Sequence, residues 1–163
     1  MSPQTAANHQ DINHTLTSLG ITLPPASKPA ASYVPFVVSE NHVYISGQLP
    51  LGIGELTDHV GQLGNGCTVE KGQETAKVCA LNVVAQLKEA CGGDLNRVKR
   101  CVKLVVFVNS SSTFTEQPQV ANGASDLMVK IFGEKGSHAR SAIGCSQLPR
   151  GVAVEVEAIF EIE

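Results

Sequence analysis

The sequence predicts an α+β domain, in which a mixed β-sheet carries two helices on one of its faces. Three observations lead to this prediction. Short runs rich in β-branched residues have a period of two, two longer stretches carry apolar residues every three or four positions, and these segments follow the order β-β-α-β-α-β-β. A chain of 163 residues, of which 42% are hydrophobic and 17% charged, is large enough to bury the core of one such domain.

The first 32 residues are predicted to be an N-terminal extension. Asp11 is placed to cap a short helix that ends near Leu19, and the segment 23–29 is rich in proline, which is typical of a stiff extended linker. The main domain is therefore expected to comprise residues 33–163.

The domain is predicted to begin with a β-hairpin. Residues 33–38 and 42–46 are rich in strand-forming side chains, and the polar residues 39–41 between them favour a reversal of the chain. A glycine-rich loop, residues 52–66, follows the hairpin.

Two helices and a central strand come next. Apolar residues recur at helical spacing across 72–91, and again across 118–133, a stretch that begins with proline and ends with glycine. Between them, the run 98–108 is nearly continuously apolar at its end, which is typical of a strand covered on both faces.

The last β region, 140–162, is broken by Pro149 and ends in a strict alternation of apolar residues and glutamates. A period of two places the apolar side chains on one face and Glu155, Glu157 and Glu161 on the other. If both helices cover one face of the sheet, apolar surface on the other face is usually covered by another subunit. A closed homo-oligomer is therefore expected.

Composition excludes several classes of protein. The formal net charge is -3 and basic residues gather only briefly within 97–103, which argues against binding to a nucleic-acid backbone. No stretch resembles a leader peptide or a membrane span. The five cysteines are odd in number, scattered and never spaced C-x-x-C, so neither disulfides nor a zinc site are indicated. A soluble cytoplasmic protein without a metal is expected.

Arg140 and the pair Glu155 and Glu157 are the first candidates for a functional site, because they lie on neighbouring β segments. Arginine offers a rigid fork of donors to a carboxylate, and a carboxylate on a half-buried strand can hold a water or a proton. The alternative is structural, because most arginines and glutamates on strands face solvent and pair with each other. Glu157 lies about 7 Å beyond Glu155 on one strand face, so only one is expected to reach a cleft.

Gly47 is a further candidate, since it ends a strand just before a proline-containing turn. It either serves chain reversal alone or lets a ligand approach its bare backbone, where the N–H would donate to a carboxylate.

Several short motifs occur in a fixed order along residues 30–163. They are Tyr33, Tyr44-Ile-Ser-Gly47-Gln-Leu-Pro50, Phe107-Val-Asn, Asn122, His-Ala-Arg140, Leu148-Pro and Val154-Glu-Val-Glu-Ala. In order and spacing they resemble the reactive-intermediate deaminase family, whose members are also called YjgF-like or L-PSP endoribonuclease-like proteins. The motifs around Arg140 and Glu155 are the most specific ones.

The resemblance implies a chorismate-mutase-like α+β subunit that forms a homotrimer with a cleft at each subunit interface. By the same resemblance, Arg140 grips the carboxylate of a small 2-imino or 2-aminoacrylate acid, assisted by the backbone N–H of Gly47. Glu155 positions the water that attacks the imine carbon, Tyr33 lines the pocket, and Asn122 belongs to the surroundings of the site. Hydrolysis to a 2-oxo acid and ammonia needs a fixed substrate, a placed water and proton transfer, so no cofactor is expected.

The chain departs from the family pattern in several places. Ala142 stands where members commonly carry a cysteine, so that only the backbone carbonyl at 142 remains to accept a hydrogen bond from a substrate. Ala31-Ser32 replaces the usual Gly-Pro before the tyrosine, the loop 51–69 is longer, and the N-terminal extension is unusual. These changes are expected to reshape the cleft.

Three functions remain open at this point. The leading hypothesis is an enamine/imine deaminase that acts on reactive products of pyridoxal-phosphate dehydratases, a role in metabolite damage control. The second is a non-catalytic sensor or carrier of small carboxylates such as 2-oxo acids, to which Ala142 and the altered loop give weight. The third, endoribonuclease, follows from an older family name and fits poorly with the acidic balance and the absence of an aromatic platform.

Overall fold

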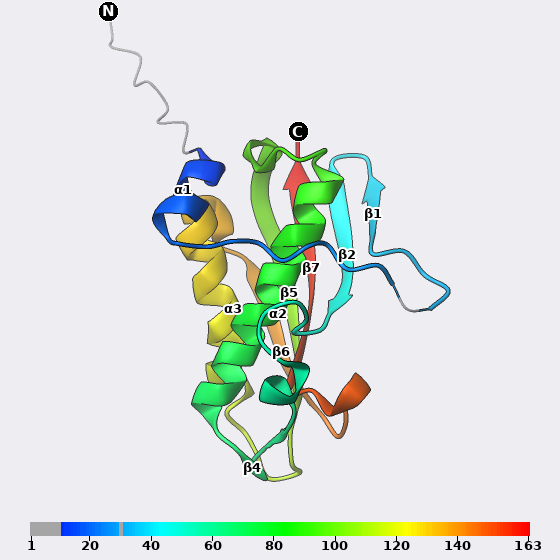
Figure 1. Cartoon of the computed structure of the whole chain (residues 1–163), viewed down its shortest axis with the longest axis vertical. Helices are drawn as coiled ribbons and strands as arrows, with labels where there is room; N and C mark the ends of the chain where they lie inside the picture. The colour runs from blue at the N-terminus through cyan, green and yellow to red at the C-terminus, as the bar shows by residue number, and fades with distance from the viewer. Residues whose placement is uncertain (1–10, 30) are drawn as a thin grey trace, which may run out of the picture.

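A five-stranded mixed sheet forms the centre of the computed structural model, which describes residues 11–29 and 31–163. Its strands lie in the order β1-β2-β7-β5-β6, with β5 and β6 parallel and all other neighbours antiparallel (Figure 1). Their bounds are Phe36–Ser39 (β1), His42–Gln48 (β2), Val98–Asn109 (β5), Ala139–Cys145 (β6) and Val154–Ile162 (β7). The predicted mixed sheet is confirmed.

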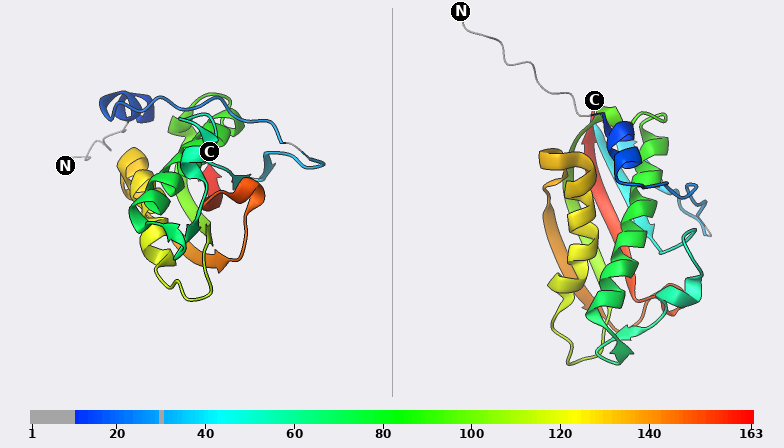
Figure 2. Two further views of the ribbon diagram at one scale, coloured as in Figure 1. Left: turned by 60° about the horizontal axis from the view of Figure 1, so that its bottom comes forward. Right: turned by 60° about the vertical axis from the view of Figure 1, so that its left-hand side comes forward.

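Two long helices, α2 (Val69–Ala90) and α3 (Gln117–Phe132), pack against each other and cover one face of the sheet. The right-hand view of Figure 2 shows both helices in front of the strands. Helix α2 begins before Gly72 because the side chain of Thr68 accepts a hydrogen bond from the N–H of Lys71 and caps the helix. The predicted arrangement of two main helices on one face is confirmed.

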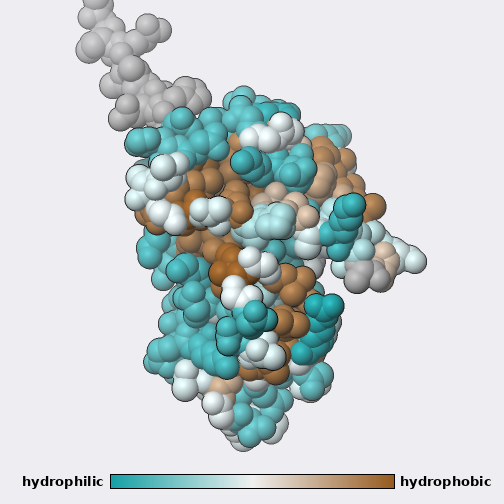
Figure 3. Space-filling view, viewed as in Figure 1, coloured by the Kyte–Doolittle hydropathy of each residue, from teal (hydrophilic) through white to brown (hydrophobic). Residues whose placement is uncertain are grey.

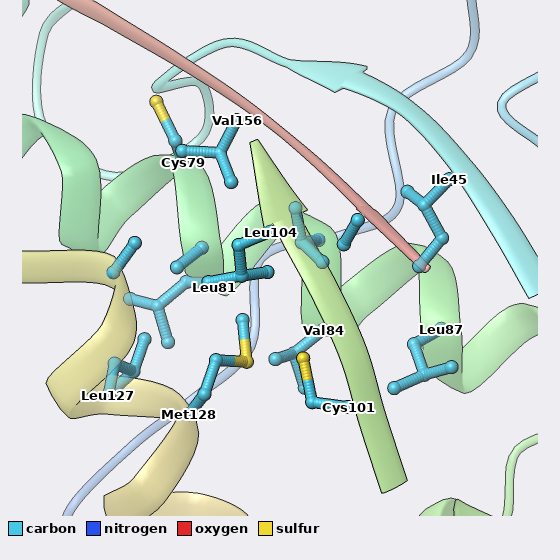
Figure 4. Close-up of a cluster of buried hydrophobic side chains, with 14 of the residues drawn as sticks. Ile45, Cys79, Leu81, Val84, Leu87, Cys101, Leu104, Leu127, Met128 and Val156 are labelled. Carbon is cyan, nitrogen blue, oxygen red and sulfur yellow. The ribbon is translucent and has the colours of Figure 1, made fainter. Parts of the chain in front are cut away.

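The core fills the space between the helices and the sheet. Figure 4 shows side chains of α2 and α3, such as Leu81 and Met128, meeting Leu104 of β5 and Val156 of β7. Along β7 the apolar residues are buried, whereas Glu155 and the other glutamates are only partly buried, so the predicted alternation is confirmed. Full burial of a side chain of this size stabilises the fold by about 1.5–3 kcal/mol.

The predicted hairpin is confirmed, since β1 and β2 pair antiparallel. Strand β1 begins at Phe36 and not at Tyr33, because Pro35 has no N–H to donate to a ladder. The carbonyl of Pro35 instead accepts a hydrogen bond of 2.9 Å from the N–H of Ser46.

The glycine-rich loop after the hairpin is more ordered than its composition indicates. It contains a 3₁₀ turn, Leu56–His59, and two short paired strands, β3 (Gln62–Leu63) and β4 (Gly66–Cys67). The side chain of His59 is buried and lies 3.1 Å from the hydroxyl of Thr75 on α2, which anchors the loop to the helical layer.

Residues 11–29 of the N-terminal segment lie along the helical layer. Its short helix α1 (Ile12–Ser18) is capped by Asp11 as expected, and it buries Leu16 in the core. The chain then crosses the outer side of α2 towards β1 (Figure 1), where Gln86 donates a hydrogen bond of 2.7 Å to the carbonyl of Ser27. On this side the surface shows apolar patches near α1 and at the centre among hydrophilic residues (Figure 3).

The domain boundary at residue 33 stays a prediction, and residues 1–10 and 30 of the predicted extension lie outside the described residues. In the part of the chain that is described, none of the helices combines the length and apolar character that a membrane crossing needs.

The sheet face opposite the helices carries large apolar side chains at its surface. Val37, Tyr44 and Ile143 are 51%, 47% and 45% exposed, and they extend over strands β1, β2 and β6. Tyr44 lies opposite Ile159, and Ile143 lies beside Phe107, so apolar residues of the inner strands continue this surface. Such a surface fits the expected homo-oligomer, which stays a prediction.

Candidate functional site

A pocket of about 330 Å³ opens where β2 ends and β7 begins. Its walls come from residues within 27–29 and 31–35 of the N-terminal segment, from the end of β2 with the turn after it, and from the turn before β7. Three of the predicted site residues, Tyr33, Gly47 and Glu155, line this space, which we call the Glu155 pocket. The structure therefore brings these three together within one chain.

Glu155 is the one acidic residue among those that line the pocket. Burial raises the pKa of its carboxyl group above the usual value, and the negative charge of Glu157 raises it further. Within the described residues, no hydrogen bond or salt bridge reaches its carboxylate. A partly desolvated carboxylate without a protein partner is suited to hold a water or to accept a proton.

Gly47 allows the carboxylate of Glu155 to lie directly against the backbone of β2. A Cβ atom on Gly47 would overlap Oε1 of Glu155. The glycine falls in a β-bulge, because the pairing of β2 with β7 shifts register between Ile45 and Gln48. The group that lies against the backbone of Gly47 is thus the Glu155 side chain of the same subunit. Donation from the Gly47 N–H to a ligand stays a prediction.

Glu157 does not line the Glu155 pocket. It borders a separate cavity of about 80 Å³ on the open face of the sheet, together with Lys103 of β5 and Ile159 of β7. Of the two glutamates, Glu155 alone is placed for the pocket.

Arg140 lies on β6, and β5 separates it from Glu155. The expectation that the two stand on neighbouring β segments is wrong within the sheet, because the last two strands of the sequence both pair with β5 and not with each other. Arg140 lies beside Leu104 of β5, whereas Glu155 lies beside Phe107. Two strand spacings across and three residues along place their Cα atoms about 14 Å apart.

The two side chains also leave the sheet on opposite faces. Leu104, next to Arg140, is buried beneath the helices, and Arg140 itself bonds to α3. Glu155 alternates with buried residues of β7 and therefore faces the side without helices. One small ligand cannot contact both groups of a single chain.

The guanidinium of Arg140 is held by α3. Its Nη1 donates hydrogen bonds to Oδ1 of Asn122 at 2.8 Å and to Oγ of Ser125 at 3.1 Å. These two bonds use both hydrogens of Nη1, and no partner for Nε or Nη2 occurs among the described residues. The Nε–Nη2 edge of the guanidinium is one that a carboxylate accepts bidentately.

His138 extends this group of residues. Its Nε2 lies 2.9 Å from Oγ of Ser125, and its Nδ1 lies 2.6 Å from the carbonyl oxygen of Gly136. Asn122, Ser125, His138 and Arg140 together are called the Arg140 cluster below.

Sequence reasoning placed Asn122 only at the periphery, gave His138 no role and missed Ser125. Two spacings contain the signal. Asn122 and Ser125 are three residues apart on a helix, so they share a face. His138 and Arg140 are two residues apart on an extended segment, so their side chains point to the same side.

Ala142 follows Arg140 on the same face of β6, and its side chain packs against the core. It does not line the Glu155 pocket, and the expected role of its carbonyl stays a prediction. All five cysteines are free. Burial raises the pKa of the Cys145 thiol and the charge of Glu155 adds to this, which favours an unreactive thiol.

Lys28 and Arg150 are the two cationic residues that line the Glu155 pocket, and sequence reasoning did not select either of them. Arg150 has a positive φ of 59°, which is uncommon for a residue with a side chain and which orients the turn before β7. In the described part of the chain, no group of three or more His, Cys, Asp or Glu residues is arranged to hold a metal ion.

A comparison with known protein families shows to which family this chain belongs. Residues 13–157 match the family model described as "YjgF/chorismate_mutase-like, putative endoribonuclease". The chain belongs to this family. Its YjgF-like α+β fold therefore agrees with the fold that the sequence motifs implied.

Individual relatives of this YjgF-like chain support the assignment. It is 55% identical to "Protein TCP17" of Trypanosoma cruzi, over 90% of this chain and 91% of that protein. It is 31% identical to the mouse 2-iminobutanoate/2-iminopropanoate deaminase, over 80% of this chain and 83% of that protein. The crystal structure of Atu1372, a protein of unknown function from Agrobacterium tumefaciens, is 44% identical, with a TM-score of 0.85 and 95% of both chains covered.

Proposed function

We propose that this protein is a hydrolytic deaminase of small 2-imino acids and their enamine tautomers, which it converts into 2-oxo acids and ammonia. The observation that carries this proposal is the carboxylate of Glu155, which is partly desolvated and without a protein partner in a pocket that Tyr33 also lines. Family members that are named for this activity, such as the mouse deaminase, support it. We place the activity in the cytoplasm, where free cysteines stay reduced.

In the proposed reaction, the Nε–Nη2 edge of Arg140 binds the carboxylate of the substrate. Glu155 holds a water beside the imine carbon, accepts one of its protons as the oxygen adds to the C=N bond, and passes that proton to the imine nitrogen. In the tetrahedral intermediate Glu155 then moves the hydroxyl proton to the amino group, so that the C=O bond forms, the C–N bond breaks and ammonia leaves. A raised pKa suits Glu155 to this exchange, because a carboxylate that is more basic than usual accepts a proton more readily and can then return it.

The site requires two copies of the chain in this proposal. Arg140 and Glu155 lie on opposite faces of the sheet within one subunit, so the guanidinium that serves one Glu155 pocket comes from a neighbouring subunit. A homotrimer with one cleft at each interface provides this arrangement three times. The exposed apolar side chains Val37, Tyr44 and Ile143 supply surface for such contacts.

An assay of 2-aminoacrylate hydrolysis tests the proposal. A serine dehydratase generates the substrate, and the release of pyruvate and ammonia is followed with the wild-type chain and with Arg140→Ala and Glu155→Gln. Arg100→Ala and Glu161→Gln are matched controls, because Arg100 is exposed on the adjacent strand β5 and Glu161 shares the strand and face of Glu155. The wild type and both controls are expected to accelerate release, and the two site variants are not.

Other outcomes point elsewhere. No acceleration by the wild type would remove the deaminase proposal, and equal acceleration by a site variant would remove the roles given to Arg140 and Glu155. Arg140-dependent binding of 2-oxobutanoate without turnover would make the protein a carrier or sensor of small carboxylates. Cleavage of RNA by highly purified protein that is lost in Glu155→Gln would restore the endoribonuclease hypothesis.

A further inference from the structure

The Arg140 cluster is a chain of hydrogen bonds whose direction is fixed at one end. The carbonyl oxygen of Gly136 can only accept, so the hydrogen between it and His138 belongs to Nδ1. In the neutral ring Nε2 then carries a lone pair and accepts the hydroxyl hydrogen of Ser125 at 2.9 Å. The Ser125 oxygen, whose own hydrogen is thereby used, presents its lone pairs to Nη1 of Arg140 at 3.1 Å.

The fixed end of this chain is anchored in the fold. Gly136 is buried at the end of the 3₁₀ turn Gly133–Gly136, and a Cβ atom there would overlap the carbonyl oxygen of Met128 on α3. The acceptor for His138 is therefore packed against the helix that also carries Ser125 and Asn122. All the partners of Arg140 are positioned by one helix and by the turn that ends it.

The partners of Arg140 are also electrically neutral. Within the described residues its guanidinium forms hydrogen bonds to an amide and a hydroxyl and no salt bridge, so no protein carboxylate competes with an incoming anion. A bound acidic partner would neutralise the charge that a substrate carboxylate needs. The cluster thus holds the guanidinium still while it leaves the charge and the Nε–Nη2 edge available.

From this geometry we propose that Ser125 and His138 are positioning residues for Arg140, which fix its guanidinium so that the Nε–Nη2 edge faces the substrate carboxylate. Neither residue touches the substrate. Their contribution is to order the arginine before binding, because a flexible side chain that must be immobilised on binding lowers the affinity. That Ser125 and His138 act on substrate binding through Arg140 rests on the proposed function. The hydrogen bonds from Gly136 to Arg140 do not depend on it.

A first measurement tests this series of hydrogen bonds in the absence of any ligand. Nitrogen-15 NMR of the full-length protein above neutral pH is expected to show His138 as the Nδ1–H tautomer. It is also expected to show hindered rotation of the Arg140 guanidinium, which Ser125→Ala releases. A predominant Nε2–H tautomer, or an Arg140 guanidinium that rotates freely in the wild type, overturns the proposal whatever the protein catalyses.

A second measurement tests the consequence for substrate. The dissociation constant for 2-oxobutanoate and the rate of 2-aminoacrylate hydrolysis are compared for Ser125→Ala, Ser125→Thr and His138→Leu. Asp126→Asn is the matched control, because Asp126 is exposed and is the next residue on α3. Ser125→Ala and His138→Leu are expected to weaken binding about tenfold, the effect of losing a hydrogen bond that orders a charged group.

The pattern among these variants separates positioning from packing. Ser125→Thr keeps the hydroxyl and is expected to bind like the wild type. The kcat value is expected to stay within about twofold in all variants, because Arg140 holds the carboxylate equally in the ground state and the transition state. Unchanged affinity in Ser125→Ala and His138→Leu, or a loss in Ser125→Thr as large as in Ser125→Ala, refutes the positioning role. If the wild type neither binds nor hydrolyses these compounds, the proposed function fails. The NMR result alone then shows whether the series of hydrogen bonds from Gly136 to Arg140 exists.

Discussion

The Glu155 pocket and the Arg140 cluster differ in how the protein surrounds the charged group of each. The carboxyl group of Glu155 is partly buried, which raises its pKa, and within the described residues no hydrogen bond or salt bridge reaches it. Arg140 has its Nη1 fully bonded to neutral groups, which restricts its motion and leaves its charge uncompensated. In the proposed deaminase, Glu155 would thus serve proton transfer and Arg140 would hold the substrate carboxylate.

The Glu155 pocket and the Arg140 cluster are also far apart within one subunit. Strand β5 and the thickness of the sheet separate the two regions, so the proposed site would need both regions from different subunits. Each half is nevertheless preformed within its own chain, by the close approach of Gly47 and Glu155 in one case and by α3 in the other. In the proposed homotrimer, assembly would therefore only have to align two surfaces that each subunit already forms by itself.

The largest expected effect comes from mixing inactive subunits. Arg140→Ala and Glu155→Gln homo-oligomers are each expected to lose at least about a hundredfold in activity, because each lacks one half of every site. After the two are dissociated and reassembled in equal amounts, about a quarter of the sites combine an intact arginine with an intact glutamate, and about a quarter of wild-type activity returns.

The pyruvate assay measures this recovery, and the same mixture without reassembly is its control. Recovery should depend on the mixing ratio and be greatest at equal amounts. Two variants that remain inactive after verified subunit exchange would show that the two halves do not meet across an interface.

A methyl group at Gly47 is the next largest test, and it addresses the Glu155 pocket alone. Gly47→Ala should push the Glu155 carboxylate away from β2 and lower the free energy of unfolding by about 1–3 kcal/mol, as overpacking of a fitted contact does. The variant should also lose activity, while the Arg140 cluster is unaffected. Chemical denaturation and the pyruvate assay measure the two effects.

A double mutant provides the control for this contact. In a Glu155→Ala background the methyl group meets no carboxylate, so Gly47→Ala should then cost little stability. An equal loss of stability with and without the Glu155 side chain would mean that the overlap is not the cause.

Glu155→Gln is expected to have a smaller effect, on stability at neutral pH. Because the folded-state pKa of Glu155 is raised, the stability that its protonated form contributes is fully present below the ordinary glutamate pKa and is lost as the pH rises through the raised value. The neutral glutamine avoids this loss, so its Tm should exceed that of the wild type by up to about 2–4 °C near pH 8.

Thermal unfolding measured from about pH 4 to about pH 8 checks the sign of this effect, since the difference should shrink towards acid pH. A glutamine variant that is less stable than the wild type at neutral pH would indicate a partner for the Glu155 carboxylate.

The smallest effect is expected from Glu157→Gln. Burial is the main cause of the raised pKa of Glu155, and the charge of Glu157 is the second, so its removal should lower that pKa. If ionised Glu155 positions the water, the acid limb of the pH–rate profile should move to lower pH, with little change in kcat at the optimum. A large loss of kcat at all pH values would instead give Glu157 a direct part in the reaction.

Local patterns predicted most of the secondary structure. The alternation along 152–162 gave the faces of β7 correctly, and the apolar stripe of 72–91 marked α2, whose actual start at Val69 depended on the cap at Thr68. These signals are local because side-chain direction follows backbone period. The interior of the loop 52–66 was not predicted, because it depends on contacts such as that of His59 with Thr75.

The candidate site was predictable residue by residue but not as an arrangement. Motif resemblance selected Arg140, Glu155, Gly47 and Tyr33, yet their order in the sequence did not show that β5 enters between β6 and β7. Strand order is a long-range property, and it decided which residues share a face. Ser125 was missed for the same reason, because only the packing of α3 against β6 makes it a partner of Arg140.

The N-terminal segment that borders the Glu155 pocket has a consequence for how substrate range can change. Residues 27–29 and 31 form a wall of the Glu155 pocket but belong to no strand of the sheet and to neither of the helices that carry the core. Substitutions in such a surface segment alter the shape and charge of the cavity at little cost to stability. Under the proposed function, substitutions in this short stretch of coil would therefore change which substrates fit the pocket, while Glu155 and helix α3 stay unchanged.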